Sequence, residues 1–239
     1  VAVTTGVCAD AARRAHLGHI LRQTGRRPMV TLKLAETPDG YAAAGPHDPR
    51  LMITGVIANN FVQMARATHD AIMVGIGTAL ADDPLMTVRL PGLDHVRPLR
   101  IVLDGALRLS TSSRLAATAR ERPVLVLTRV DAPRDREAAL RAAGVDVARL
   151  PDPRDPLPAL AARGLTRVFS EGGPTVGSRL IARRLADEVI LLTGERPLGR
   201  AGVAALAAGA RATLESEIGY RLVEEARLGP DRLRRWERV

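Results

Sequence analysis

Short, largely apolar segments that alternate with helical patterns constrain the fold of this chain more than any other feature. The segments lie at 71–75, 99–104, 124–128, 167–171 and 189–192, and most of their residues are Val, Ile, Leu or Met. Segments of this length and composition are typical of strands that are covered on both faces. Helical patterns lie between them at about 132–143, 155–163 and 174–185. The alternation predicts an α/β fold with a mostly parallel central sheet and helices on both faces.

The segments near the two ends of the chain have recognisable patterns as well. Apolar residues recur at helical spacing over residues 8–22, and Met29–Ala35 has the composition of a strand. Segments 219–227 and 231–237 predict an antiparallel strand pair that closes one edge of the sheet.

A further helix is expected to run from Thr54, whose side chain can cap it, to about Thr68. The spacing of its apolar residues predicts a buried side that consists of Ile57, Phe61, Met64 and Ala65. The region before this helix contains the turn Pro38–Gly40 and is predicted to be a loop.

Composition makes several kinds of partner unexpected. The single cysteine, Cys8, cannot form an internal disulfide, which favours a reducing, cytoplasmic setting. No apolar run approaches the ~20 residues that span a bilayer, so no membrane partner is expected. His16 and His19 lie on one predicted helix without a third ligand, so no metal site is expected either.

The net charge of +9 leaves the choice of partner open, because basic chains bind nucleic acids, membranes or phosphorylated small molecules. The arginines are scattered without a long basic tract, and aromatic residues make up only 2% of the chain. We therefore expect a solvated basic surface and no nucleic-acid partner, with an anionic small molecule accounting for part of the charge.

The segment 168–175 is a candidate ligand site, because a strand there ends in an acid and continues into a helix through two glycines. Glu171 is followed by Gly172 and Gly173, and the helix begins near Pro174. Glycines let the backbone approach a ligand closely, and a helix start offers N–H groups suited to a phosphate. The alternative is an ordinary glycine turn between a strand and a helix.

The segment 75–84 is a second candidate, because it also leaves the end of an apolar strand, where open sheets bind their ligands. Its Gly75-x-Gly77 pattern lacks the third glycine of a dinucleotide-binding motif. Asp82 and Asp83 follow, and a simple turn-capping role for both is the alternative here.

Three basic residues are candidates for a reaction site. Lys33 interrupts an otherwise apolar strand, so it lies either at a sheet edge or in a cleft, where a lysine can take part in proton transfer. Arg66 and Arg89 can clamp a phosphate by paired hydrogen bonds, although arginines on surface helices and loops usually have no such role.

Six segments follow one another in an order that belongs to one family. They are VTLKLA, PDG, ITG, RATHDAIMVGIGTALADDPLMTVR, RPLRIVLD and SEGGPT. In this order they resemble the C-terminal reductase domain of the bifunctional riboflavin-biosynthesis deaminase/reductase, over about residues 26–237. The resemblance implies a dihydrofolate-reductase-like fold, with a mostly parallel central sheet, helices on both faces and an antiparallel edge.

The resemblance implies that NADPH reduces the ribose of 5-amino-6-(5-phosphoribosylamino)uracil to a ribityl chain by hydride transfer to C1′. By matching positions, the implied cofactor contacts are Ala35, Thr78, Asp82 and the segment Gly173–Arg179, which begins with Gly173, Pro174, Thr175 and Val176. The implied substrate contacts are Arg66, Met86, Arg89 and Glu171. Lys33 and Glu171 are the implied catalytic groups that handle protons as the sugar ring opens. A homodimer is implied as well.

The chain departs from the family pattern at two places. Family members often have Asp/Glu-Ser-x-Trp before ITG, with the serine on the substrate and the tryptophan on the cofactor. Here the stretch is Asp48-Pro49-Arg50-Leu51-Met52, without a serine and with Met52 in place of the tryptophan. The aspartate–serine pair common after the IVL strand is Asp104-Gly105. Both changes bear on cofactor packing and substrate affinity.

Residues 1–25 resemble the last strand and helix of the deaminase domain that precedes the reductase in the bifunctional enzyme. The zinc signature of that domain, His-x-Glu followed by Pro-Cys-x-x-Cys, is absent from the sequence, so no deamination is expected. We therefore expect a remnant of that domain at 1–25 and the reductase domain at 26–239. The chain is either the remainder of a bifunctional protein or a naturally shortened one.

Two other functions stay open at this point. A reductase of the same fold could act on another pterin- or pyrimidine-like substrate, as the altered stretch 48–52 suggests. A degenerate domain kept as a dimerisation module or as a basic nucleic-acid binder would bind no NADPH. The sequence also does not decide between NADPH and NADH, because it identifies no residue that would bind the 2′-phosphate.

Overall fold

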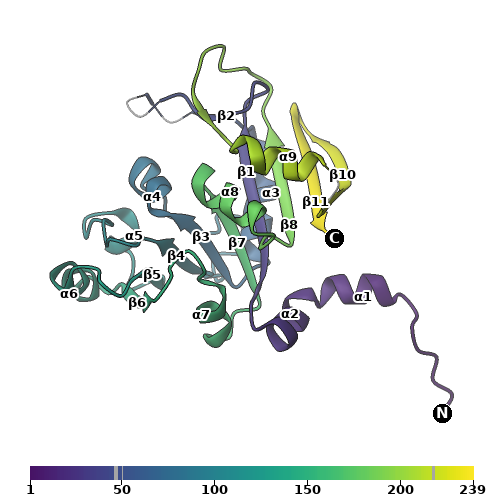
Figure 1. The fold of residues 1–239 in the computed structure, drawn as a ribbon, viewed down its shortest axis with the longest axis horizontal. Coiled ribbons are helices and arrows are strands. Elements are labelled where there is room, and N and C mark those ends of the chain that lie inside the picture. Colours follow the sequence, from purple (N-terminus) through teal and green to yellow (C-terminus); the bar gives the residue numbers. More distant parts are fainter. Residues whose placement is uncertain (46–47, 50, 217–218) are drawn as a thin grey trace.

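The structure is a computed structural model that describes residues 1–45, 48–49, 51–216 and 219–239. Its centre is a nine-stranded sheet in the order β10-β11-β8-β1-β7-β3-β4-β5-β6 (Figure 1). These strands are β1 (Met29–Glu36), β3 (Ala71–Gly75), β4 (Leu99–Leu103), β5 (Val124–Arg129), β6 (Asp146–Leu150), β7 (Arg167–Gly172), β8 (Glu188–Thr193), β10 (Tyr220–Leu228) and β11 (Asp231–Arg238). A small separate sheet pairs β2 (Tyr41–Ala43) with β9 (Val203–Ala204).

The seven strands from β8 to β6 in this order pair in parallel. β11 pairs with β8, and β10 with β11, in antiparallel orientation. The predicted α/β fold with a mostly parallel sheet and an antiparallel edge is therefore confirmed. Because the parallel strands all run the same way, their carboxyl ends meet along one edge of the sheet. Open α/β sheets bind their ligands at this edge.

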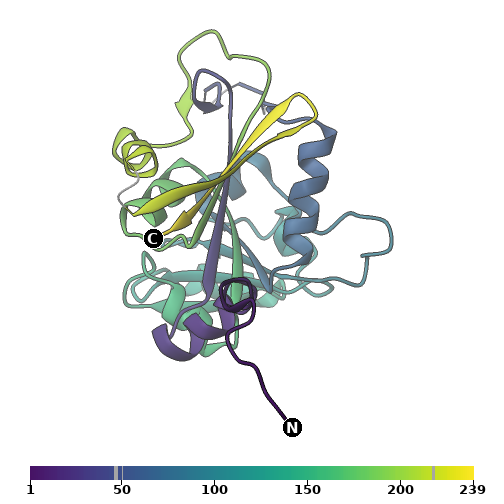
Figure 2. The same ribbon diagram turned by 90° about the vertical axis from the view of Figure 1, so that its right-hand side faces the viewer.

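Helices cover both faces of the sheet, as predicted (Figure 2). α3 packs on one face, where Ala58 and Val62 contact a core cluster with Phe169, and α8 packs on the other face, against β1. The described helices are α1 (Ala9–Ala15), α2 (Leu17–Gly25), α3 (Val56–Ala67), α4 (Ile76–Asp82), α5 (Arg114–Ala117), α6 (Arg134–Ala142), α7 (Leu157–Ala162), α8 (Pro174–Ala182) and α9 (Ala208–Glu215). Within the described part of the chain, no helix combines the length and the apolar character needed to cross a membrane.

The N-terminal segment differs from its prediction. Two short helices, α1 and α2, replace the single helix expected over 8–22, and the described residues 1–8 contain no strand. α1 buries no residue and extends away from the sheet (Figure 1). α2 packs closely on the start of β7, since a Cβ on Gly18 would lie 2.6 Å from the carbonyl oxygen of Thr166. The change of direction near His16 lets α2 pack there while α1 stays in solvent.

The prediction for the buried side of α3 was only partly right, since Phe61 and Ala65 are partly buried against a core cluster. The buried residues are Ala58, Val62, Gln63 and Arg66, whereas the side chains of Ile57 and Met64 are 55% and 50% exposed. The helix is also not capped by Thr54, because its N-cap is Gly55, without a side-chain hydrogen bond. Gln63 and Arg66 point inward because their partners are Arg89 in the loop after α4 and Glu171 on β7, and Ile57 and Met64 point outward as a result.

Candidate active site

The carboxyl edge of the sheet brings the two predicted catalytic residues together. Lys33 lies on β1, which is flanked by β8 and β7, so Lys33 is not on an edge strand of the sheet. Leu32 on β1 is paired with Ser170 on β7. The next residues along these two parallel strands are Lys33 and Glu171, which are therefore neighbours. The charge of Lys33 is close enough to lower the pKa of Glu171.

Arg66 joins this pair from α3 and forms a two-point ion pair with Glu171. Its Nε lies 2.5 Å from Glu171 Oε1, and its Nη2 donates to Oε2 at 2.8 Å. The third nitrogen, Nη1, donates to the carbonyl oxygen of Thr87 at 2.8 Å. The two side chains are only 10% and 16% exposed. Arg66 therefore fixes both the carboxylate of Glu171 and the loop after α4.

The pKa of Glu171 is lowered from its ordinary value of 4.5, so the carboxylate is anionic at neutral pH. Burial raises this pKa, but the charge and hydrogen bond of Arg66, followed by the charges of Lys33 and Arg89, outweigh the effect of burial. The ionised carboxylate of Glu171 accepts hydrogen bonds, and its negative charge favours the charged form of Lys33 beside it.

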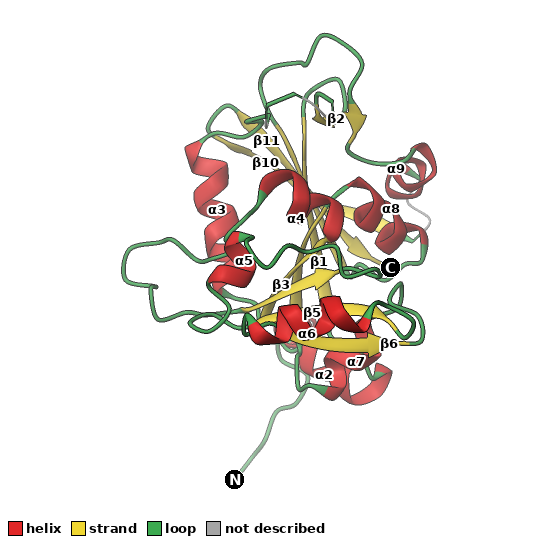
Figure 3. Ribbon diagram, turned by 90° about the vertical axis from the view of Figure 1, so that its left-hand side faces the viewer, coloured by secondary structure: helices red, strands yellow, loops and turns green. Residues whose placement is uncertain are grey.

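The two glycine-containing turns lie against each other where β3 and β7 end, at the starts of α4 and α8 (Figure 3). A Cβ on Gly173, which has φ 92, would lie 2.5 Å from Thr78 Oγ1, and a Cβ on Gly75 would lie 2.8 Å from Val176 Cγ2. Thr78 Oγ1 donates to the carbonyl oxygen of Gly172 at 3.4 Å. Gly173 is the N-cap of α8 and offers no side chain to its first-turn N–H groups. This close, backbone-lined approach fits a pyrophosphate group.

The remaining predicted contacts lie around this edge. Ala35 follows Lys33 on the same side of β1 and is partly buried, and Asp82 ends α4. Arg89 has an exposed side chain, and its main-chain N–H donates to Gln63 Oε1 at 2.9 Å. Met86 has φ 50 and is 2% exposed, with its side chain in the core cluster that contains Ile72. At the start of α8, Thr175 is exposed and Val176 is buried.

The two departures from the family pattern are partly visible. Arg50 lies outside the described residues, Met52 is 73% exposed, and Asp48 forms an ion pair of 2.9 Å with Arg200. Asp104 is completely buried, and its neighbour Gly105 lies under the side chain of Arg129.

Comparison with known proteins decides the family. The chain matches the family described as the RibD C-terminal domain over residues 28–222. The chain belongs to this family. A 2,5-diamino-6-ribosylamino-4(3H)-pyrimidinone 5′-phosphate reductase of Archaeoglobus fulgidus is 33% identical over 180 residues, which are 70% of this chain and 80% of the relative.

Longer relatives share nearly the whole chain. The riboflavin biosynthesis protein RibD of Aquifex aeolicus is 27% identical over 233 residues, which are 97% of this chain and 64% of the relative. The structure of Acinetobacter baumannii RibD is 27% identical, has a TM-score of 0.82, and is matched over 98% of this chain and 64% of its own. The chain thus spans 64% of the length of these RibD proteins, and its fold is that of the matched part.

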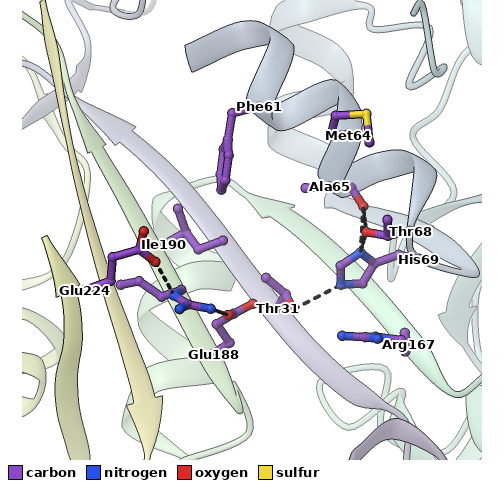
Figure 4. A pocket seen from close by; sticks show the side chains of 11 residues that line it. Thr31, Phe61, Met64, Ala65, Thr68, His69, Arg167, Glu188, Ile190 and Glu224 are labelled. Atoms are coloured by element: carbon purple, nitrogen blue, oxygen red, sulfur yellow. Dashed lines mark hydrogen bonds and ion pairs between the residues drawn. The ribbon is translucent and has the colours of Figure 1, made fainter. Parts of the chain in front are cut away.

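This RibD C-terminal domain also has a hollow of about 270 Å³ between α3 and the antiparallel edge of the sheet (Figure 4). Its lining residues are Thr31, Phe61, Met64, Ala65, Thr68, His69, Arg167, Glu188, Ile190, Glu224 and Arg235. Arg235 contacts Glu188 and Glu224 at 3.0 and 2.8 Å, and His69 Nε2 lies 3.0 Å from Thr31 Oγ1. None of the predicted site residues lines it, so this hollow is separate from the candidate active site.

Two residues that hold the site together were missed by the sequence analysis. Gln63 fixes the main chain of Arg89, and the Thr87 carbonyl oxygen accepts from Arg66. The signal for Gln63 was its spacing of three residues from Arg66, which predicts that both lie on one side of the helix. Among the described residues, no group of three or more His, Cys, Asp or Glu side chains could hold a metal ion.

Arg66→Met should lower the free energy of unfolding by about 3 kcal/mol at pH 7, because a largely buried carboxylate loses its counter-ion. The lowered pKa of Glu171 means that its ion pair stabilises the fold at pH values above the ordinary glutamate pKa of 4.5, which applies in the unfolded chain. This contribution is lost as the pH falls through the still lower pKa of the folded protein. The difference between wild type and variant should therefore shrink below about pH 4.

Urea unfolding at pH 7 and pH 3.5 measures this difference. The double variant Arg66→Met/Glu171→Gln is the control, because it has no carboxylate to leave unpaired and should regain part of the loss at pH 7. A difference between wild type and Arg66→Met that is the same at both pH values would contradict the assignment.

Proposed function

We propose that this chain is an oxidoreductase of riboflavin biosynthesis that reduces the ribose of 5-amino-6-(5-phosphoribosylamino)uracil to the ribityl chain. The observation that carries the proposal is the cluster of Lys33, Arg66 and Glu171 beside the glycine-lined turns. It combines a proton donor, a fixed anionic acceptor and a backbone surface for phosphates at one sheet edge. Membership of the RibD C-terminal domain family supports it.

A second candidate is the same reduction on 2,5-diamino-6-ribosylamino-4(3H)-pyrimidinone 5′-phosphate. Two relatives carry the name of that reductase, one from Archaeoglobus fulgidus at 33% identity and one from Methanothermobacter thermautotrophicus at 36% identity. The two substrates share the phosphorylated ribose on which the reaction takes place, so the same catalytic groups serve either.

The proposed cofactor is NADPH, which supplies a hydride when it is bound. The start of α8 would hold its pyrophosphate through the N–H groups of the first turn, in the segment that contains Gly173, Pro174, Thr175 and Val176. Thr78 and Asp82 on α4 would contact it from the opposite turn, and Ala35 would lie beside it on β1.

The proposed proton chemistry rests on Lys33 and Glu171. Reduction breaks the C1′–O4′ bond of the ribose, so O4′ gains a proton as C1′ gains a hydride. Lys33 carries an ammonium group, which can donate that proton. Glu171 keeps this charge in place, accepts hydrogen bonds from the sugar hydroxyls and is itself oriented by Arg66.

Phosphate and pyrimidine binding involve the loop after α4. Arg89 is proposed to bind the substrate phosphate, because its side chain is exposed while its main chain is fixed by Gln63. Met86 is proposed to contact the substrate through its main chain, since its side chain belongs to the core. Arg66 contributes mainly through Glu171.

Lys33→Met and Glu171→Gln should each lower the rate of NADPH oxidation at least a hundredfold with either pyrimidine substrate, because each removes a group that handles a proton or holds its charge. Absorbance of the reduced nicotinamide measures the rate, and titration of NADPH fluorescence should give unchanged cofactor affinity. Lys33→Arg is the control for charge and should restore binding of substrate but little turnover. Full activity of Lys33→Met would exclude the proposed proton donor.

Gly173→Ala should weaken NADPH binding more than tenfold. A Cβ at this φ of 92 is strained, and it would collide with Thr78 Oγ1 at 2.5 Å, so the two turns must move apart. Fluorescence titration measures the affinity. Gly209→Ala on α9 is the matched control, since its Cβ would meet nothing within 4 Å, and it should bind NADPH like the wild type. Equal affinities for the two variants would argue against a cofactor at this turn.

We also propose that the protein acts as a homodimer in the cytoplasm, without a nucleic-acid or membrane partner. The outer side of α3 exposes Ile57 and Met64, and Met64 and the partly buried Phe61 line the hollow of Figure 4. Beside it, Arg235 is already paired with Glu188 and Glu224, so the charges of this surface are balanced within one subunit and do not oppose contact with a second copy. The origin of residues 1–25 as a remnant of a deaminase domain is part of the same proposal.

Met64→Glu should convert the dimer to a monomer, because two carboxylates would enter an apolar interface without partners. Sedimentation velocity over a range of protein concentrations measures the mass. Val130→Glu is the matched control, with a wild-type side chain that is 55% exposed against 50% for Met64, and should stay a dimer. A wild-type protein that is monomeric at all concentrations would refute the proposed interface.

A further inference from the structure

The strands beyond the glycine turns determine where the adenosine half of a bound dinucleotide would lie. Gly75 is paired with Leu103 on β4, and Leu103 is paired with Leu127 on β5. The ends of β4 and β5 therefore lie one and two strand spacings from the pyrophosphate turn, or about 5 and 10 Å. This is the length scale of one nucleoside, so a ribose would lie over the end of β4.

The residue at the end of β4 has an acidic side chain that does not face this ribose position. Asp104 is 0% exposed, and its carboxylate accepts hydrogen bonds from the N–H groups of Leu109 at 2.8 Å and Ala106 at 3.4 Å. In Rossmann-type sites that bind NAD, an acidic residue holds the ribose 2′-hydroxyl and would repel a phosphate there. Asp104 is turned into its own loop and exerts no such selection.

A basic side chain lies over the same place. A Cβ on Gly105 would lie 3.4 Å from Arg129 Cγ and 3.7 Å from its Cδ, so the stem of Arg129 crosses the space that a larger residue at 105 would fill. The main-chain N–H of Arg129 also donates to the carbonyl oxygen of Gly105 at 3.4 Å. The Arg129 side chain is 54% exposed, and its Nε donates to Asp131 Oδ1 at 3.0 Å.

The ion pair with Asp131 leaves Arg129 available to a stronger anion. Asp131 is 69% exposed, and exposed pairs of this kind contribute little, about 0–1 kcal/mol. A phosphate dianion carries more charge and accepts two hydrogen bonds from a guanidinium group. The neighbouring Arg149 is far less available, because it is 15% exposed and contacts Glu137 at 2.5 and 2.8 Å.

We propose that Arg129, lying over Gly105, binds the 2′-phosphate of NADPH and thereby sets the preference for NADPH over NADH. The assignment rests on the proposed function, since it requires that the glycine turns bind a dinucleotide. Asp131 acts against it, because its carboxylate competes with the phosphate for the guanidinium group.

Dissociation constants for NADPH and NADH, measured by fluorescence titration of the full chain, test the proposal without any turnover. Wild type should prefer NADPH. Arg129→Ala should weaken NADPH binding about tenfold to a hundredfold, the range for one hydrogen-bonded charge, and leave NADH binding within twofold. Asp131→Asn should change NADPH binding in the opposite direction. Arg163→Ala is the control. It removes the same charge from an exposed position after α7, near the amino end of β7 and away from the proposed site.

The outcomes are distinct. If Arg129→Ala lowers the affinities for NADPH and NADH equally, or lowers neither, the assignment of Arg129 is overturned while the reductase proposal stands. Loss of the preference in Arg108→Ala or Arg136→Ala instead would assign the 2′-phosphate to the adjacent hollow that these two residues line, and Arg129 would be wrong. A wild type that binds neither dinucleotide refutes the reductase proposal together with this subsite.

Discussion

The ion pair between Arg66 and Glu171 is the interaction on which the site depends, because it joins α3 to the end of β7 and fixes the rotation of that helix. Residues of a helix advance by about 100° each. With Arg66 directed at the sheet edge, Met64 and Ile57 lie about 160–180° away from it and must face outward. One pair thus orients the carboxylate of the site and at the same time exposes an apolar stripe on the opposite side of the helix.

The charges around Glu171 favour an anionic substrate. Lys33, Arg66 and Arg89 all lower the pKa of this single carboxylate, so cations outnumber it at this edge of the sheet. The positive helix start at Gly173 lies on the same edge, across the ends of the strands. The phosphate groups of the proposed substrate and cofactor would meet a positive potential there. Thr78 lies so close to Gly173 that no side chain fits there, which leaves the backbone at this turn open to a ligand.

The sequence was sufficient for the parallel strands but not for the details that build the site. Runs such as 71–75 and 124–128 are apolar because both faces of their strands are covered, and this signal is local. β6 was missed because Asp146 and Arg149 break its apolar pattern, and Arg149 is held by Glu137, a contact that no local pattern contains. α4 was missed because it is short and begins in the glycine segment.

The error on α3 has the same origin. Hydrophobic periodicity assigns arginine to solvent, whereas Arg66 is buried because its partner comes from a strand more than a hundred residues later. The residue pattern marked the glycine segments, Lys33, Arg66 and Arg89 as candidates, and the resemblance gave each of them a role. Met86 came from the resemblance alone, and it illustrates the limit of that approach. Position alone assigned it to the substrate, while the structure directs its side chain into the core through a backbone with φ 50. Resemblance transfers a place in the chain, and the side-chain direction has to come from packing.

The positive charge of the chain follows from its construction. Arg27 and Arg238 both bind Asp187, which is 4% exposed, and Arg211 and Arg234 both contact the buried Glu36.

Arg100 is 1% exposed and donates to the carbonyl oxygen of Leu85, next to Met86, and to the hydroxyl of Thr118. Burial, followed by the charge of Arg122, lowers its pKa to about 10, which still leaves it cationic at neutral pH. Two arginines that share one carboxylate leave one positive charge unbalanced. An arginine that donates only to carbonyl and hydroxyl oxygens also keeps its charge unbalanced. The excess of +9 therefore arises in part from arginines that hold strands and loops together, and it does not require a nucleic-acid partner.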